Sequence, residues 1–125
     1  MTVMNPALLP KVRSDAIMRA MRNYPCSLRV SSFYPGYTCS PQNTVVGCHI
    51  GTPGKSMGSK STDLAVAAGC QRCHDILDGR DNLRWDFILD TYPTAFMNRV
   101  LQGLIETQQR LVDDGVIVVP DGELI

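Results

Sequence analysis

A stripe of apolar residues toward the C-terminal end is the clearest periodic signal in the chain. Its members, with one glutamine among them, recur at spacings of three and one: Met97, Val100, Leu101, Leu104, Ile105, Gln108, Leu111 and Val112. These spacings place side chains on one face of an α-helix, so they predict an amphipathic helix and tail over residues 91–119. Gly115 is expected just beyond the helix end, where glycine is common. The stripe is wide enough for both a core and an interface, so a homodimer is one alternative.

Two shorter patterns precede this helix in the N-terminal third of the chain. Ser14 followed by residues 15–22 is typical of a short N-capped helix, which Pro25 stops. Residues 1–24 are therefore predicted to be a helical extension. Residues 26–42 are rich in Ser, Tyr, Pro and Gly, which predicts a loop or a loose hairpin.

The middle of the chain has the composition of short strands separated by a loop. β-Branched residues predict a strand over 44–50, and a glycine-rich loop follows over 51–62. Residues 63–69 predict a second strand, although their alanines would also suit a helix. A helix is expected from Arg72 to about Leu77. Together these elements predict one α+β domain over residues 1–125, with its core in residues 25–90.

Composition narrows the class of protein. An apolar share of 44% and a charged share of 19% are typical of globular proteins rather than of disordered or fibrous ones. No apolar run approaches the roughly 20 residues that a bilayer-spanning helix needs. Residues 1–10 lack the basic and then apolar pattern of an export signal. A cytoplasmic location with no membrane association is therefore expected.

The net charge of zero conceals two halves of opposite sign. Residues 1–62 contain seven basic residues and one acidic residue, whereas residues 63–125 contain five basic and eleven acidic residues. Halves of this kind predict a basic face for a polyanion and an acidic part that faces away or holds metal. The alternative is that two solvated surfaces merely differ in charge.

The five cysteines predict a metal site rather than disulfides, given the expected reducing compartment. Cys70 and Cys73 are separated by two residues, so both thiolates can reach one tetrahedral Zn²⁺ from a tight turn. Cys26 and Cys39 are the natural second pair, and a closed four-thiolate site of this kind is structural. A redox Cys-x-x-Cys motif and ordinary buried cysteines are the alternatives.

A second group of candidate residues contains both histidines of the chain. His74 and Asp78 are four residues apart and share one face of the predicted helix, so they could hold a divalent cation such as Mg²⁺ or Mn²⁺. A pair at this spacing is also common on helix surfaces without any ligand. If His49 approached that cation, it could take a proton from water.

Two other chemistries are disfavoured by spacing. Residues 51–56 end like a phosphate-binding P-loop, but His49 stands where that motif needs glycine. Cys48 and His49 are adjacent on a predicted strand and therefore point to opposite faces, which disfavours a nucleophile and base pair.

The order of these motifs resembles that of HNH (ββα-metal, or His-Me finger) nucleases, over residues 26–117. The resemblance is carried by Val46-Gly47-Cys48-His49-Ile50, a glycine-rich loop, and Gly69-Cys70-Gln71-Arg72-Cys73-His74-Asp75. The order is particularly similar to that of the small prophage-encoded YbcO-like family.

The resemblance implies a ββα-metal core with a four-cysteine zinc staple, flanked by an N-terminal and a C-terminal helix. It implies a metal-dependent endonuclease of phage or prophage origin that acts on DNA. His49 would be the general base, His74 and Asp78 would bind the catalytic cation, and Asp63 would orient the loop or His49. Lys55, Lys60 and Arg72 are the expected nucleic-acid contacts.

Two departures from the family pattern leave alternatives open. Cys48 occupies the position before the general base, where many family members have an Asp or His ligand, and a thiol is a poor ligand for Mg²⁺. The wide spacing of Cys26 and Cys39 allows Cys48 to replace one of the zinc ligands. The rival interpretation is a non-catalytic zinc-ribbon module that binds DNA or a protein partner.

Overall fold

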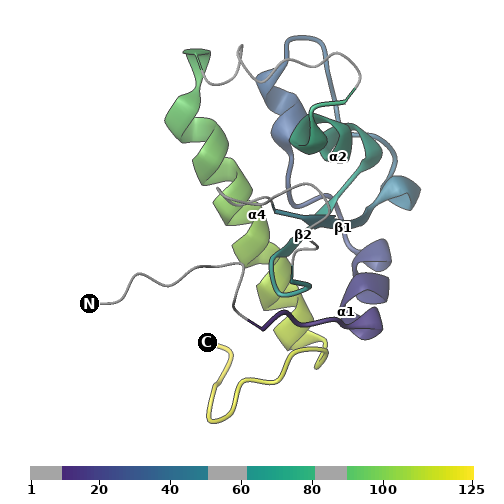
Figure 1. Cartoon of the computed structure of the whole chain (residues 1–125), viewed down its shortest axis with the longest axis vertical. Coiled ribbons are helices and arrows are strands. Elements are labelled where there is room, and N and C mark those ends of the chain that lie inside the picture. The colour runs from purple at the N-terminus through teal and green to yellow at the C-terminus, as the bar shows by residue number, and fades with distance from the viewer. Residues whose placement is uncertain (1–9, 51–61, 81–89) are drawn as a thin grey trace.

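A computed structural model of the chain describes residues 10–50, 62–80 and 90–125. It has a small α+β fold in which a two-stranded β-hairpin contacts a long C-terminal helix (Figure 1). The helices and strands described are α1 (Asp15–Ala20), β1 (Val46–His49), β2 (Val66–Gly69), α2 (Gln71–Asp78) and α4 (Pro93–Asp113). Single 3₁₀ turns lie at Met21–Asn23, Val30–Phe33 and Gln42–Thr44. The α+β class is confirmed, whereas the subdivision of residues 1–125 into an extension, a core and a tail stays a prediction.

The hairpin lies at the centre of the fold. β1 and β2 are antiparallel, with Val46 opposite Gly69 and His49 opposite Val66. The outer edge of β2 is covered, because Ala68 N–H donates to Thr107 Oγ1 (3.0 Å) and Ala68 O accepts from Ser27 N–H (2.8 Å). The hairpin is therefore fixed between α4 and the loop that begins the cysteine-containing region.

Helix α4 buries one face and leaves another exposed. Its buried face is rotated from the predicted stripe, since only Val100 and Leu111 are shared among the buried residues Phe96, Val100, Gly103, Thr107 and Leu111. A Cβ at Gly103 would lie 2.7 Å from Ser27 O, so only glycine lets the helix approach that backbone. Met97, Leu101 and Ile105 remain exposed. Pairing of two copies through this exposed part of the stripe stays a prediction.

Ion pairs also join α4 to the loop after Cys26. Glu106 binds Arg29 (2.8 Å) and Arg99 (2.8 Å), and Arg99 donates to Ser27 O (3.1 Å). Arg110 donates to Ser27 Oγ (3.1 Å). One face of α4 thus positions the loop that carries the first cysteine.

Most element predictions are confirmed, but both strands begin later than predicted, at Val46 rather than 44 and at Val66 rather than 63. Ser14 Oγ accepts from Ile17 N–H (3.2 Å) as the N-cap of α1, and Gly115 has the positive φ (+74°) expected after α4. Residues 66–69 form a strand rather than a helix. The strand predicted over 44–50 begins only at Val46, because Thr44 ends a 3₁₀ turn in which its Oγ1 donates to Pro41 O (2.7 Å). No helix among residues 10–50, 62–80 and 90–125 is long and apolar enough to span a membrane.

Candidate functional site

Four cysteines converge beside the N-terminus of α2. The Sγ atoms of Cys26, Cys39, Cys70 and Cys73 all lie within 4.8 Å of one another. Cys70 is the N-cap of α2 and Cys73 lies in its first turn, while Cys26 and Cys39 come from the two ends of the preceding loop. The Sγ atoms of Cys39 and Cys73 are 3.8 Å apart. That distance matches the edge of about 3.8 Å of a tetrahedron with Zn–S bonds of about 2.3 Å.

Backbone N–H groups point at two of these sulfurs. Arg29 N–H (3.5 Å) and Cys70 N–H (3.4 Å) donate to Cys26 Sγ, and Ser40 N–H donates to Cys70 Sγ (3.3 Å). Arg29, whose N–H makes the first of these bonds, has a left-handed backbone conformation (φ 48°). Donors of this kind stabilise thiolates, which are the metal-binding form of cysteine.

The electrostatics of the cluster favour a cation. A hydrogen bond from the Cys73 thiol, opposed by burial and aided by backbone N–H donors, lowers the pKa of Cys26 to about 5. The pKa of Cys73 is raised above its ordinary value by the hydrogen bond that Cys73 makes to Cys26, by burial and by the nearby thiolate charge. Several thiolates can therefore lie this close to one another only if a positive ion neutralises their negative charge. The four-cysteine cluster is consistent with a structural Zn²⁺ site.

The fifth cysteine, Cys48, stands apart from the cluster. Its side chain is fully buried, and Cys48 is not part of the group whose sulfurs converge. Burial, followed by the charges of Cys26 and Asp78, raises the pKa of Cys48 to about 12. The alternative in which Cys48 replaces one of the zinc ligands is therefore wrong, and Cys48 is a neutral buried thiol.

His49 and Asp63 form a hydrogen-bonded pair at the end of the hairpin where β1 ends and β2 begins. His49 Nε2 lies 2.8 Å from Asp63 Oδ1, and Ser14 N–H donates to Asp63 Oδ2 (2.7 Å). The Asp63 side chain is only 7% exposed, whereas that of His49 is 30% exposed. Burial acts to raise the pKa of Asp63, but the hydrogen bonds from His49 and Ser14 outweigh it, and the net pKa is lowered.

This pair determines which ring nitrogen of His49 is free. An ionised carboxylate only accepts hydrogen bonds, so Nε2 must donate to Asp63. In the neutral imidazole, Nδ1 then carries the lone pair. The arrangement can hold the ring in one orientation and leave Nδ1 as a proton acceptor beside solvent.

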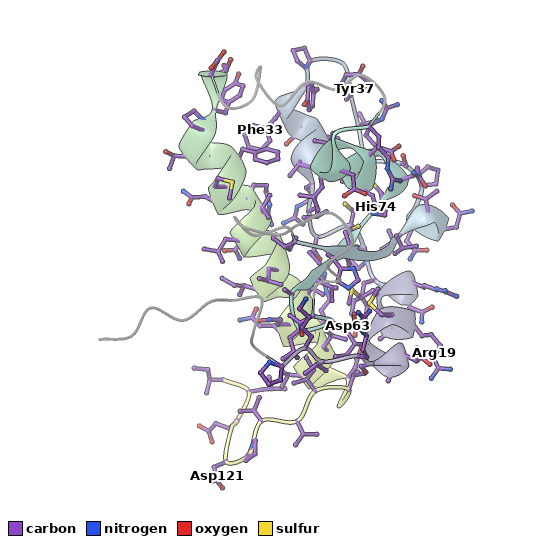
Figure 2. The ribbon with its side chains drawn as sticks, in the orientation of Figure 1. Arg19, Phe33, Tyr37, Asp63, His74 and Asp121 are labelled. Atoms are coloured by element: carbon purple, nitrogen blue, oxygen red, sulfur yellow. The ribbon has the colours of Figure 1, made fainter. Side chains whose placement is uncertain are left out.

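His74 and Asp78 lie on one face of α2, as their spacing predicts. His74 Nε2 is 3.2 Å from Asp78 Oδ2, which also pairs with Arg80 (3.1 Å). Within the described parts of the chain, the four cysteines are the only close group of three or more potential ligand side chains. Figure 2 shows Asp63 on the α1 side of the hairpin and His74 toward α2. The structure therefore does not place His49 in one ligand group with His74 and Asp78.

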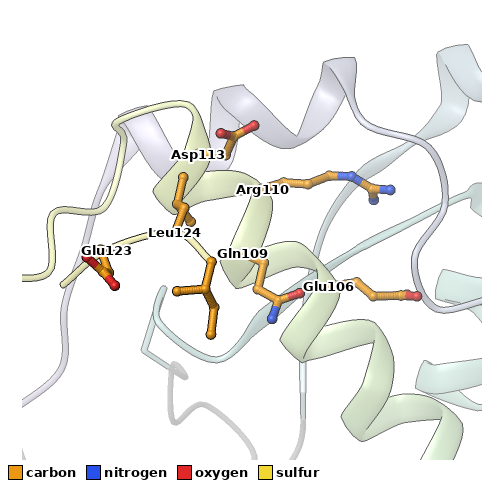
Figure 3. A pocket seen from close by; sticks show the side chains of 7 residues that line it. Glu106, Gln109, Arg110, Asp113, Glu123 and Leu124 are labelled. Carbon is orange, nitrogen blue, oxygen red and sulfur yellow. The ribbon is translucent and has the colours of Figure 1, made fainter.

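The expected nucleic-acid contacts have different outcomes. Arg72 stacks over the Tyr37 ring, with its guanidinium carbon 4.4 Å from the ring centroid, so its charge already has an aromatic partner. Lys55 and Lys60 lie outside the described residues. A hollow between α4 and the C-terminal segment, lined by Glu106, Arg110 and Glu123 among others, contains none of the predicted site residues (Figure 3).

Two contributors to these sites were not predicted from the sequence. Ser14 was expected only as a helix cap, yet its N–H also fixes Asp63, which lies 49 residues further along the chain. Arg29 supplies an N–H to the cysteine cluster three residues after Cys26. For the Arg29 contact, the only local signal in the sequence is a residue that can adopt positive φ three positions after a cysteine.

Comparisons with known proteins add no family to these observations. No protein-family model, curated protein or solved structure matches the chain. The resemblance to HNH nucleases therefore rests on the motifs of the sequence, and what is established is a four-cysteine cluster near a small hairpin that packs against a helix.

Proposed function

We propose that the protein is a metal-dependent endonuclease that hydrolyses nucleic-acid phosphodiester bonds, with DNA as its substrate and a structural zinc ion in its cysteine cluster. The observation that carries this proposal is the hydrogen-bonded pair of His49 and Asp63 at the end of β1. The order β1, β2, α2, with the second histidine on α2, supports the ββα-metal interpretation. Each residue is assigned a role from its contacts.

His49 is the general base in this proposal. Its Nδ1 takes a proton from water as the water oxygen attacks phosphorus, the bond from phosphorus to the leaving deoxyribose oxygen breaks, and that oxygen takes a proton from solvent. Asp63 holds the ring in place through Nε2 and stabilises the positive charge that develops on it. Asp63 is thus a positioning residue, and Ser14 N–H holds it in turn. General-base catalysis of this type contributes about 10²- to 10⁴-fold to the rate.

His74 and Asp78 would hold the catalytic Mg²⁺ or Mn²⁺. They offer one imidazole nitrogen and one carboxylate oxygen, and Arg80 would have to release Asp78 when the cation binds. Mg²⁺ commonly keeps several waters and binds through few protein ligands, so a neutral Cys48 need not contribute. The cation, when bound, would neutralise charge on the scissile phosphate.

The charge at the end of α2 acts on Cys48, whose side chain points to the opposite face of β1 from His49. The charge of Asp78 contributes to the raised pKa of Cys48, the residue next to His49. The end of α2 therefore lies close enough to β1 for its charge to act there. A phosphodiester that contacts both regions would need to pass between them.

Cleavage of a supercoiled plasmid tests this proposal. Wild-type protein with one bound zinc is expected to nick the plasmid when Mg²⁺ or Mn²⁺ is added, and Asp78→Asn is expected to need more cation for the same rate. His49→Ala is expected to lose cleavage by about 10²-fold or more while it keeps its zinc. Cleavage that persists unchanged in His49→Ala would contradict the mechanism.

The non-catalytic zinc module remains the second candidate because Asp78 is already neutralised. Its ion pairs with His74 and Arg80 satisfy the carboxylate without a cation. If that candidate holds, the wild-type protein binds DNA or a protein partner, yet no divalent cation induces cleavage.

A further inference from the structure

We infer that four basic residues around α1 form the surface that binds the nucleic-acid backbone, directly beside the His49–Asp63 pair. The four residues, called the basic segment below, are Lys11, Arg13, Arg19 and Arg22. The inference deepens the proposed function, because it names the part of the chain that would hold the phosphates next to His49.

The basic segment differs from the other described arginines in its side-chain contacts, although the charge of Arg13 acts on the nearby Asp63 carboxylate. All four side chains are exposed, and none makes a hydrogen bond or ion pair with any residue in the described ranges 10–50, 62–80 and 90–125. By contrast, the other described arginines each contact a carboxylate, an aromatic ring or a serine: Arg29, Arg72, Arg80, Arg99 and Arg110. Asp15 is the only acidic residue between Lys11 and Arg22. Free positive charge is therefore concentrated in this segment.

The basic segment is attached to the catalytic pair rather than loosely tethered. Val12 N–H donates to Thr62 Oγ1 (3.0 Å), Asp63 N–H donates to Val12 O (2.8 Å), and Ser14 N–H donates to the Asp63 carboxylate (2.7 Å). Val12 and Ser14, which make these bonds, alternate along the chain with Lys11 and Arg13. The backbone that carries Lys11 and Arg13 is therefore held in place before any ligand binds, which lowers the entropy lost on binding.

Packing on the other side fixes α1 against β1. A Cβ at Gly47 would lie 2.9 Å from Met18 Cε, so the helix side chain sits directly on the strand that carries His49. Ile17 is buried, and Arg19 lies on the solvent side of α1 (Figure 2). Arg13 is near enough to Asp63 to help lower its pKa. A phosphate bound by Arg13 would consequently lie near the His49 ring.

Anionic backbone is the ligand that this chemistry fits. Exposed arginines and lysines without acidic partners bind phosphates with little regard to base sequence. Each phosphate contact releases counterions, so the logarithm of the binding constant falls linearly with the logarithm of the salt concentration. The slope is about 0.9 per contact for duplex DNA and about 0.7 for a single strand. The number of contacts is thus measurable from the salt dependence alone.

The test is a binding titration of a fluorescent DNA duplex, and of one of its strands, by zinc-loaded full-length protein without added Mg²⁺ or Mn²⁺. In the variant with Lys11→Gln, Arg13→Gln, Arg19→Gln and Arg22→Gln, the salt slope is expected to fall by about 3.6 for the duplex and about 2.8 for the strand. Affinity at low salt is expected to weaken by on the order of a hundredfold. The DNA form for which the affinity falls by the larger factor is the preferred ligand.

A matched control keeps the charges and changes only the side chains. The variant with Lys11→Arg, Arg13→Lys, Arg19→Lys and Arg22→Lys is expected to bind with the wild-type slope. Paired variants, Lys11→Gln with Arg13→Gln and Arg19→Gln with Arg22→Gln, should each lose about half of the slope change, and they serve if the fourfold variant is unstable. Zinc content and thermal melting check that each variant is folded.

Because no cleavage is needed, this test separates the surface from the chemistry. Absence of nicking with a reduced slope in the neutralised variant would contradict the proposed nuclease but leave the binding surface in place. Wild-type affinity and slope in the neutralised variant would overturn the inference, as would failure of the wild-type protein to bind either DNA form.

Discussion

The cysteine cluster and the His49–Asp63 pair are built in opposite ways. In the cluster, four sulfurs face one another and backbone N–H groups approach from outside, so no position is left for a substrate. In the pair, Asp63 is buried and doubly hydrogen-bonded, but the His49 side chain remains 30% exposed. A saturated site can hold the fold together, whereas a site that acts on substrate needs an accessible atom, and in the proposed function that atom is His49 Nδ1.

The two regions also differ in what supports them. The cluster depends on α2 and on the loop that Glu106 and Ser27 attach to α4. The pair depends on the segment before α1, through Ser14 and Val12. Because the supports are separate, a change in the pair should leave the zinc content of the cluster measurable.

The largest effect is expected from removal of a zinc ligand. Cys70→Ser should abolish zinc binding and cooperative folding, because the free energy of metal binding in such sites, about 10 kcal/mol or more, is comparable to the whole stability of a small domain. Metal analysis and thermal melting monitored by circular dichroism would measure both losses. Cys48→Ala is the matched control, since Cys48 is equally buried but outside the cluster, and it should keep one zinc per chain.

A second, smaller effect is expected from Asp63→Asn. The amide can preserve the shape of the site, but it does not stabilise a positively charged imidazole, so the cleavage rate should fall by about 10²-fold. Zinc content should not change, because Asp63 is not part of the cluster. A variant that loses zinc and cleavage together would show that the two regions are not independent.

The smallest effect concerns pH and the loop before Cys26. Burial, a hydrogen bond to Asp114 and the charge of that carboxylate raise the pKa of Tyr24 to about 12 from 10.0. A raised native pKa means that the stability linked to Tyr24 is complete below pH 10.0 and is lost as the pH rises toward about 12. Urea unfolding across this range should show a decline that is smaller in Tyr24→Phe. An equal decline in both proteins would remove Tyr24 as its cause.

Much of the fold follows from local patterns in the sequence. The stripe of α4 repeats a helical spacing over many residues, and Ser14 with residues 15–22 contains a complete N-cap signal. The cysteine cluster was predicted because a closed structural zinc site takes four ligands, and only Cys48 competed with the other cysteines for a place. The start of β1 was predicted less well, because Thr44 forms a side-chain bond to Pro41 O that replaces strand pairing.

The contacts of the candidate site were harder to predict. Asp63 was expected to orient the loop or His49, and its bond to His49 confirms that it contacts the imidazole. The hydrogen bonds from Val12 and Ser14, which hold the backbone beside Lys11 and Arg13, join segments about 50 residues apart. Nothing in either segment encodes the partner. Arg80 likewise neutralises Asp78, which the spacing of His74 and Asp78 did not indicate.

Chemical rescue of His49→Gly tests most directly whether His49 is the proton acceptor. The variant is expected to keep its zinc and its melting temperature, to nick plasmid about 10²- to 10⁴-fold more slowly than wild type, and to regain activity as free imidazole is added. The His49 side chain is 30% exposed, which leaves room for imidazole to enter from solvent. A wild-type nicking rate in His49→Gly would contradict the assignment, and so would a lost activity that no imidazole concentration restores in the zinc-loaded variant.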